Sequence, residues 1–110
     1  MSTYRLNVRR FLNRRNHHAG AYIIARVRDT SLSTERNRWS DVILDIADCG
    51  RVISLDFPLD TAAERSNSIE KARLLAGVLT RFAEALEAEA EVWASTQRER
   101  RKTNAREVAQ

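Results

Sequence analysis

Two short stretches near the start of the chain, residues 3–12 and 21–28, carry mostly polar or basic side chains and one ring at alternate positions. These positions hold Arg5, Asn7, Arg9, Tyr22, Ile24, Arg26 and Arg28. Because alternate residues of a β-strand point to the same face, these side chains would share one surface. A guanidinium group bonds two phosphate oxygens at once, and a ring offers a base a stacking contact worth about 1–3 kcal/mol. The pattern is typical of a surface that binds single-stranded nucleic acid.

The segment between these two stretches, NRRNHHAG, adds positive charge. Arg14 and Arg15 would extend the basic surface beyond the strands, and Phe11 would join it if the first strand reaches that far. The predicted nucleic-acid-binding residues are therefore Arg5, Arg9, Arg14, Arg15, Tyr22, Arg26 and Arg28. The alternative is an ordinary solvated sheet face on which Tyr22 and Ile24 make cross-strand pairs.

Charge is unevenly distributed along the 110 residues, whose formal net charge is +4. Residues 1–40 hold nine Arg and two acidic residues, which gives +7, whereas residues 41–66 carry −4. Seventeen of the nineteen basic residues are Arg. Arg suits phosphate recognition, but a GC-rich genome would produce the same bias. The first third of the chain is thus a basic module in front of an acidic one.

Other residues with reactive side chains lack partners at a useful spacing. Asp41 and Asp45 would lie about 13 Å apart on one strand, too far to share an ion. Asp45 and Asp56 would lie diagonally on neighbouring strands and could come closer, but no His, Glu or Lys signature accompanies them. His17 and His18 are adjacent in a loop, where a solvated pair is expected, and Cys49 lies at a turn with no His near it in the sequence. The sequence therefore predicts no metal site, no cofactor and no catalytic residue.

The elements that would position the basic surface are four strands, over residues 3–12, 21–28, 39–48 and 51–57. Each shows the alternation of apolar and polar residues that a half-buried strand requires. Pro58 ends the last strand, since proline cannot donate to a ladder.

The second hairpin has a predictable register. Gly50 favours a two-residue loop at Cys49-Gly50, which places Ile46 opposite Ile53, Leu44 opposite Leu55 and Val42 opposite Phe57. Shifting one strand by a single residue would set apolar side chains against polar ones. The two-residue loop and the alternation of side chains therefore predict the same register for this hairpin.

A helix is predicted from about Ser68 to about residue 98. The segments TAAE (61–64) and NSIE (67–70) both fit a capping box. Apolar residues then recur in steps of four and three at Ala72, Ala76, Leu79, Ala83, Leu86, Ala90 and Trp93. Residues 99–110 show no apolar periodicity and are predicted to be a disordered basic tail. Residues 1–98 would form a single domain.

Four antiparallel strands followed by one helix make an α+β domain of order ββββα, with the helix packed on the apolar sheet face. That face would carry Tyr4, Leu6, Val8, Ile23, Ala25, Val27, Val42, Leu44, Ile46, Ile53, Leu55 and Phe57. The order of elements resembles that of the PUR and whirly families, which bind single strands and dimerise. This resemblance lies in topology alone, and it implies single-strand binding and a dimer.

The predicted helix is longer than the sheet that it would cover. A helix to residue 98 measures roughly 45 Å, whereas a ten-residue strand measures about 33 Å. Its overhanging end carries Val92 and Trp93, and a Trp at an unsupported helix end is costly to leave in water. The sequence therefore predicts a homodimer with Val92 and Trp93 in the interface.

These features together predict a non-catalytic nucleic-acid-binding protein, for single-stranded DNA or RNA rather than duplex. The alternative is a dimeric adaptor that docks a protein partner through the open sheet face or the helix end. No apolar run approaches the ~20 residues of a membrane span, and the N-terminus has charges where a signal peptide is apolar. The single cysteine cannot form an intramolecular disulfide, so a cytoplasmic protein of bacterial or phage origin is expected.

Overall fold

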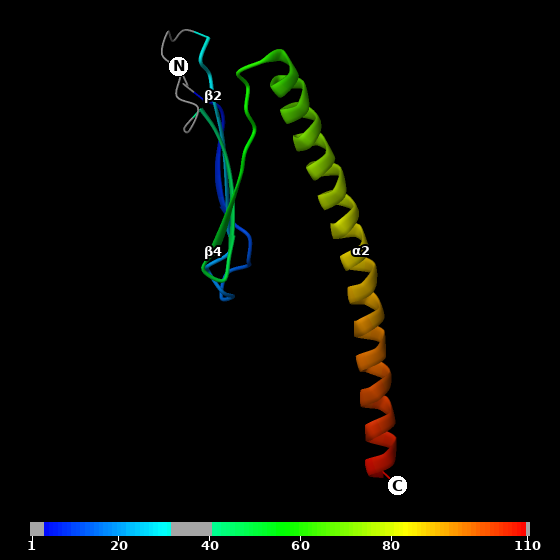
Figure 1. Ribbon diagram of the computed structural model, residues 1–110. Coiled ribbons are helices and arrows are strands. Elements are labelled where there is room, and N and C mark those ends of the chain that lie inside the picture. Colours follow the sequence, from blue (N-terminus) through cyan, green and yellow to red (C-terminus); the bar gives the residue numbers. More distant parts are fainter. Residues whose placement is uncertain (1–3, 32–40, 110) are drawn as a thin grey trace. The chain divides into compact units, whose positions relative to one another are not determined.

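The structure, a computed structural model, describes residues 4–31 and 41–109. In these two stretches, strands β1 (Tyr4–Phe11), β2 (Tyr22–Arg28), β3 (Val42–Asp48) and β4 (Arg51–Leu55) precede helix α2 (Ala62–Ala109), as Figure 1 shows. The strands form one antiparallel sheet in the order β1-β2-β3-β4. The predicted α+β fold of order ββββα is confirmed. Trp39, at the start of the predicted third strand, lies outside the described residues.

The chain divides into two compact units, residues 1–70 and residues 71–110. The first holds the sheet, the connection after β4 and the first turns of α2, and the second is the continuation of α2. The boundary predicted at residue 98 falls inside this helix. The packing of α2 on the apolar face of the sheet stays a prediction.

The ladder places the apolar side chains of the four strands in common rows. These rows are Leu6–Val27–Val42, Val8–Ala25–Leu44–Leu55 and Ile23–Ile46–Ile53. The predicted pairs Ile46–Ile53 and Leu44–Leu55 are both confirmed. Because the side-chain period of a strand is two, this register puts all of these residues on one face.

Two residues predicted for the apolar face lie outside the apolar rows of the ladder. The register shifts between Tyr4 and Leu6, and this bulge sets Tyr4 opposite Arg28 instead of on the apolar face. A bulge inserts one extra residue and so reverses the alternation on one side of it. Phe57 follows the end of β4, so the predicted pair Val42–Phe57 is not part of the ladder.

The β3–β4 turn explains why the register of this hairpin is fixed. Cys49 and Gly50 both have positive φ, 51° and 78°. Positive φ at both central residues is the geometry of a type I′ turn, whose twist matches that of the flanking strands. Glycine adopts this conformation without steric cost, whereas Cys49 adopts it as a non-glycine residue.

Gly50→Val should therefore destabilise the protein. A β-branched residue at this positive φ is strained, and the free energy of unfolding should fall by about 1–3 kcal/mol. Gly50→Asn is the matched control, because Asn tolerates the left-handed region, and its effect should be smaller. Urea denaturation of the full chain measures both variants, and equal midpoints would contradict the turn assignment.

Helix α2 begins earlier than the predicted start near Ser68. The Thr61 hydroxyl accepts a bond from the backbone N–H of Glu64 at 3.1 Å, and the Thr61 carbonyl accepts the first helical bond from Arg65 at 2.9 Å. Thr61 is therefore the N-cap. Ser68, only 3% exposed, donates its hydroxyl to the carbonyl of Pro58 at 2.7 Å. The second segment, NSIE, does not start a helix because Asn67 and Glu70 already lie within α2.

Helix α2 also ends later than predicted, at Ala109, so residues 99–109 are helical where a disordered tail was predicted. Arg, Lys, Glu, Gln and Ala, which dominate this segment, have high helix propensity even without an apolar stripe. Within it Thr103 bonds the carbonyl of Glu99 at 3.0 Å, and Arg106 in the last turn complements the helix dipole. A segment without apolar periodicity has no apolar face that could pack against another element, but it can still be helical.

The described residues bury little apolar surface. The buried hydrophobic residues among them are Ala21 and Ala47, at 3% and 2% exposure, and no large side chain is fully buried. The apolar side chains of β2 and β3 are half-buried. No helix in the described part of the chain combines the length and the hydropathy needed to cross a membrane.

Candidate nucleic-acid interface

The first hairpin gathers the predicted binding side chains into adjacent rows. Asn7 pairs with Arg26, Arg9 with Ile24, and Phe11 with Tyr22. Directly opposed residues of an antiparallel pair share a face and lie about 4.5–5.5 Å apart at Cβ. Strand β1 reaches Phe11, so the ring joins this face, and β1 is an edge strand of the sheet.

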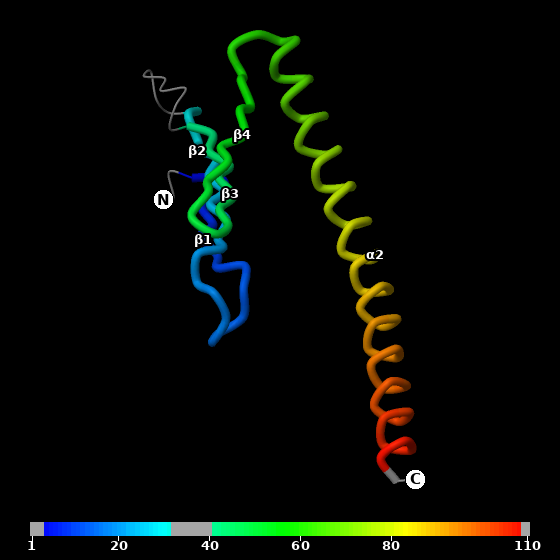
Figure 2. The backbone as a smooth tube through the Cα atoms, turned by 60° about the horizontal axis from the view of Figure 1, so that its bottom comes forward, coloured from blue at the N-terminus to red at the C-terminus, as the bar shows by residue number. Residues whose placement is uncertain are grey.

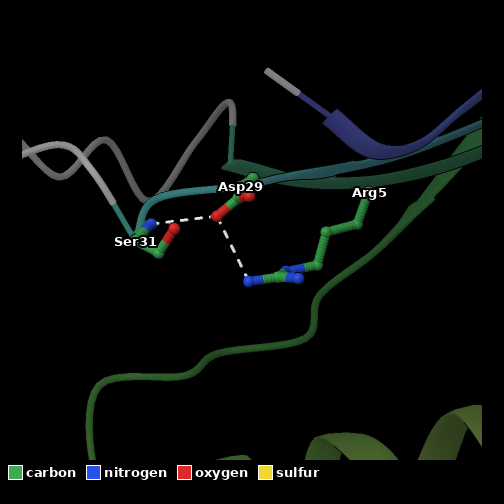
Figure 3. Close-up of polar contacts among 3 residues, drawn as sticks. All are labelled: Arg5, Asp29 and Ser31. Atoms are coloured by element: carbon green, nitrogen blue, oxygen red, sulfur yellow. Dashed lines mark hydrogen bonds and ion pairs between the residues drawn. The ribbon is translucent and has the colours of Figure 1, made fainter. Parts of the chain in front are cut away.

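Arg5 is held in a structural contact. Its Nη2 lies 3.2 Å from Oδ1 of Asp29, and the backbone N–H of Ser31 donates to the same oxygen at 3.0 Å, as Figure 3 shows. The hydrogen bonds from Ser31, with a smaller contribution from Arg5, hold the pKa of Asp29 below its usual value. Arg5 thus helps to fix the chain just after β2 and is partly neutralised there.

Two more of the predicted arginines have partners within unit 1. Arg26 donates through Nε to Oδ1 of Asn7 at 3.0 Å, and Arg28 lies 3.8 Å from Oδ1 of Asp41. The bond to Asn7 fixes the Arg26 stem along the strand and engages Nε alone. Arg28 shares its charge with a carboxylate, so its attraction for phosphate is reduced.

Arg9, Arg14 and Arg15 are different, because they make no ion pair within the part of the chain that the structure describes. All three are exposed, and the Phe11 ring beside them is 67% exposed. A shallow hollow of about 340 Å³ is lined by Phe11, Arg14, Arg15 and further residues of the β1–β2 loop. An unpaired guanidinium and an exposed ring are thus neighbours at the end of β1.

The β1–β2 loop that carries Arg14 and Arg15 is held by its own hydrogen bonds. The Leu12 N–H donates to the Ala21 carbonyl at 2.9 Å and closes the loop. The His17 N–H bonds the Arg14 carbonyl at 3.1 Å, across Asn16 at φ 74°. Asn readily adopts this left-handed conformation. These contacts give the two arginines a defined backbone, which reduces the entropy lost on binding.

Acidic residues bound the basic surface on the side of β3. Asp45 lies opposite Ile24 and Ser54, on the same face as Arg9. Asp41 and Asp56 instead line a separate cavity of about 700 Å³ within unit 1. This face therefore changes from basic to acidic across the sheet, which limits a nucleic-acid surface to the first hairpin and its loop.

The structure also brings together three residues for which the sequence analysis predicted no common site. Among the described residues, ligand atoms of His18, Asp48 and Cys49 lie within 4.8 Å of one another. A hydrogen bond with Asp48, and the negative charge of that carboxylate, raise the pKa of the Cys49 thiol. The only sequence signal was indirect. His18 lies in the loop of the first predicted hairpin and Cys49 in the loop of the second, and because the first strands of both hairpins run in the same direction, these loops lie at the same end of the sheet.

Of the seven predicted binding residues, Arg9, Tyr22 and Arg26 lie on the shared face and Arg14 and Arg15 on the adjoining loop. Arg5 and Arg28 are engaged by carboxylates. The predicted interface residues Val92 and Trp93 are exposed on α2, Trp93 to 60%. No model of a known protein family, no curated protein and no solved structure matches this chain.

Proposed function

We propose that the protein binds single-stranded DNA or RNA, without catalysis, through the first hairpin and its loop. The observation that carries the proposal is the exposed Phe11 ring beside three arginines, Arg9, Arg14 and Arg15, that no carboxylate neutralises in the described part of the chain. Guanidinium groups would hold the phosphates while rings stack on bases.

A single strand fits this surface better than a duplex. Phe11 and Tyr22 lie directly opposite each other at the end of the hairpin, and stacking on rings requires bases that are not already stacked in a duplex. Arg9 and Arg26 lie on the same face, so a backbone could run along the hairpin toward the loop. Arg5 and Arg28, held by acids, contribute to the field more than to direct contacts.

The test is fluorescence anisotropy of labelled oligonucleotides titrated with the full chain across a salt series. We expect tighter binding of a single strand than of the matched duplex. Each phosphate contact should add about −0.7 to the slope of log K against log salt. An absence of binding at low salt would overturn the proposal. An oligonucleotide affinity that does not change with salt would argue against phosphate contacts. It would favour the adaptor instead, because apolar docking displaces no counterions.

We also propose that the protein is a homodimer, assembled through α2 in the cytoplasm. Unit 2 is one helix, so nothing else in that unit can cover its apolar stripe. In its later part, Leu86, Val92 and Trp93 are each more than half exposed. Leu86 and Trp93 lie seven residues apart, which is the spacing by which helices pair, and a second copy would supply the same stripe.

Charge favours an antiparallel pairing of the two helices. Acidic residues precede Trp93, at Glu84, Glu87, Glu89 and Glu91, and basic residues follow it, at Arg98, Arg100, Arg101 and Lys102. If two copies cross at Trp93, Glu84 lies opposite Lys102 of the other copy, each nine residues away from the crossing. The two-fold axis of a symmetric dimer generates this pair of opposite charges twice.

A further inference from the structure

Three side chains with metal-binding atoms meet at one end of the sheet, within unit 1. His18 lies in the β1–β2 loop, Asp48 ends β3 and Cys49 is the first residue of the turn. Because β1 and β3 both run antiparallel to β2, the loop and the turn are at the same end of the sheet, as Figures 1 and 2 show. One ligand atom from each lies within 4.8 Å of the others.

The spacing suits a tetrahedral metal ion. Zinc binds His nitrogen, Cys sulfur and carboxylate oxygen at about 2.0–2.3 Å, which puts ligand atoms roughly 3.3–3.8 Å apart. At no more than 4.8 Å, the separations between ligand atoms in this cluster lie within about 1.5 Å of these values. The set of one nitrogen, one sulfur and one oxygen suits zinc or cobalt better than magnesium or calcium, which prefer oxygen alone.

The backbone around the cluster is arranged to hold these side chains. A Cβ on Gly20 would lie 2.5 Å from Nε2 of His18, so the absence of a side chain there lets the imidazole occupy its position. The His18 carbonyl accepts a bond from Nδ2 of Asn13 at 2.6 Å. Cys49 takes a left-handed φ of 51°, an unfavourable conformation for a non-glycine residue. The β1–β2 loop and the β3–β4 turn thus bring their ligand atoms close to one point.

We propose that His18, Asp48 and Cys49 form a binding site for a divalent transition metal of the zinc type, with water as the fourth ligand. All three residues are exposed, so the ion can enter from solvent. Binding replaces the proton of the Cys49 thiol, which passes to solvent as the thiolate–metal bond forms. The ion would join the β1–β2 loop to the β3–β4 turn.

The charges of the three ligands match that of a divalent ion. Two anionic ligands and one neutral imidazole then leave the zinc-type site with no net charge. This inference does not depend on the proposed nucleic-acid binding, and each can fail without the other.

Cobalt(II) is the probe, because thiolate coordination gives a charge-transfer band that zinc lacks. The reduced full chain, titrated with CoCl₂, should develop this band at one metal per chain and release one proton per metal. Zinc should displace the cobalt. Cys49→Ser should abolish the band, and His18→Gln and Asp48→Asn should each weaken binding by about a hundredfold or more, because loss of even an outer-shell partner costs 10–100-fold.

His17→Gln is the matched control, since it removes the neighbouring imidazole of the same loop and should leave cobalt binding unchanged. Far-UV circular dichroism checks that each variant is folded, as expected for exposed positions. The assignment is wrong if the wild-type chain shows no thiolate–cobalt band, or if His18→Gln binds as well as the wild type. An equal loss in His17→Gln would likewise overturn the role given to His18.

Discussion

A variant with Arg9, Arg14 and Arg15 all changed to Gln should bind single-stranded oligonucleotides at least tenfold more weakly than the wild type at moderate salt. These arginines make no ion pair in the described part of the chain, so their charge is available to phosphate. Three lost contacts should make the slope of log K against log salt shallower by about 2. Fluorescence anisotropy across a salt series measures both quantities.

The matched control removes the same charge from a different element. Lys71, Arg73 and Arg81 lie on α2, and changing all three to Gln lowers the net charge by the same amount. If the two triple variants lose affinity equally, binding depends on overall charge, and the first hairpin is not the interface. If only the hairpin variant loses affinity, the site lies where we propose it.

Trp93→Ala should shift the protein from dimer to monomer. A buried aromatic side chain covers about 150–250 Å², and Trp93 is 60% exposed within a single copy. Its truncation removes the largest side chain of the helix stripe from both halves of the interface at once. Interface aromatics of this kind cost about 2 kcal/mol or more on truncation, and a symmetric dimer loses two of them. Sedimentation equilibrium should record the change in mass.

Val108→Ala is the control for this variant. Val108 is the most exposed large apolar residue of the described chain, at 87%, and lies on the same helix. It falls outside the stripe that ends at Trp93, so its loss should leave the dimer intact. A wild-type protein that sediments as a monomer at tens of micromolar would refute the dimer and leave the stripe exposed to solvent.

Some parts of this fold could be read from local pattern because two independent local rules agreed. In the second hairpin, Gly50 favours a two-residue turn, and the same register pairs Ile46 with Ile53. Because side chains alternate with a period of two, a shift of the register by one residue would place apolar side chains opposite polar ones. Phe11 shows the same logic, since its place on the shared face follows from the alternation of β1 once the strand reaches it.

Other features of the fold cannot be predicted from local patterns, either because two patterns favour different structures or because no pattern marks the feature. Two capping boxes were available for α2, and the helix starts at the first, with Thr61 as its N-cap, so that the second lies inside the helix. The bulge near Tyr4 cannot be recognised from the alternation of apolar and polar residues, and that alternation therefore predicts the wrong face for Tyr4. At the C-terminal end, the helix continues through a segment whose propensity is high although its apolar periodicity is absent.

The sequence by itself determined the order of elements, the register of the second hairpin and the basic character of the first, because each depends on residues close together in the chain. Tertiary structure alone decided which arginines are neutralised, since Asp29 and Asp41 meet Arg5 and Arg28 only after the sheet forms. It alone brought His18 to Asp48 and Cys49. Such a meeting depends on strand direction and loop closure, which residue spacing does not encode.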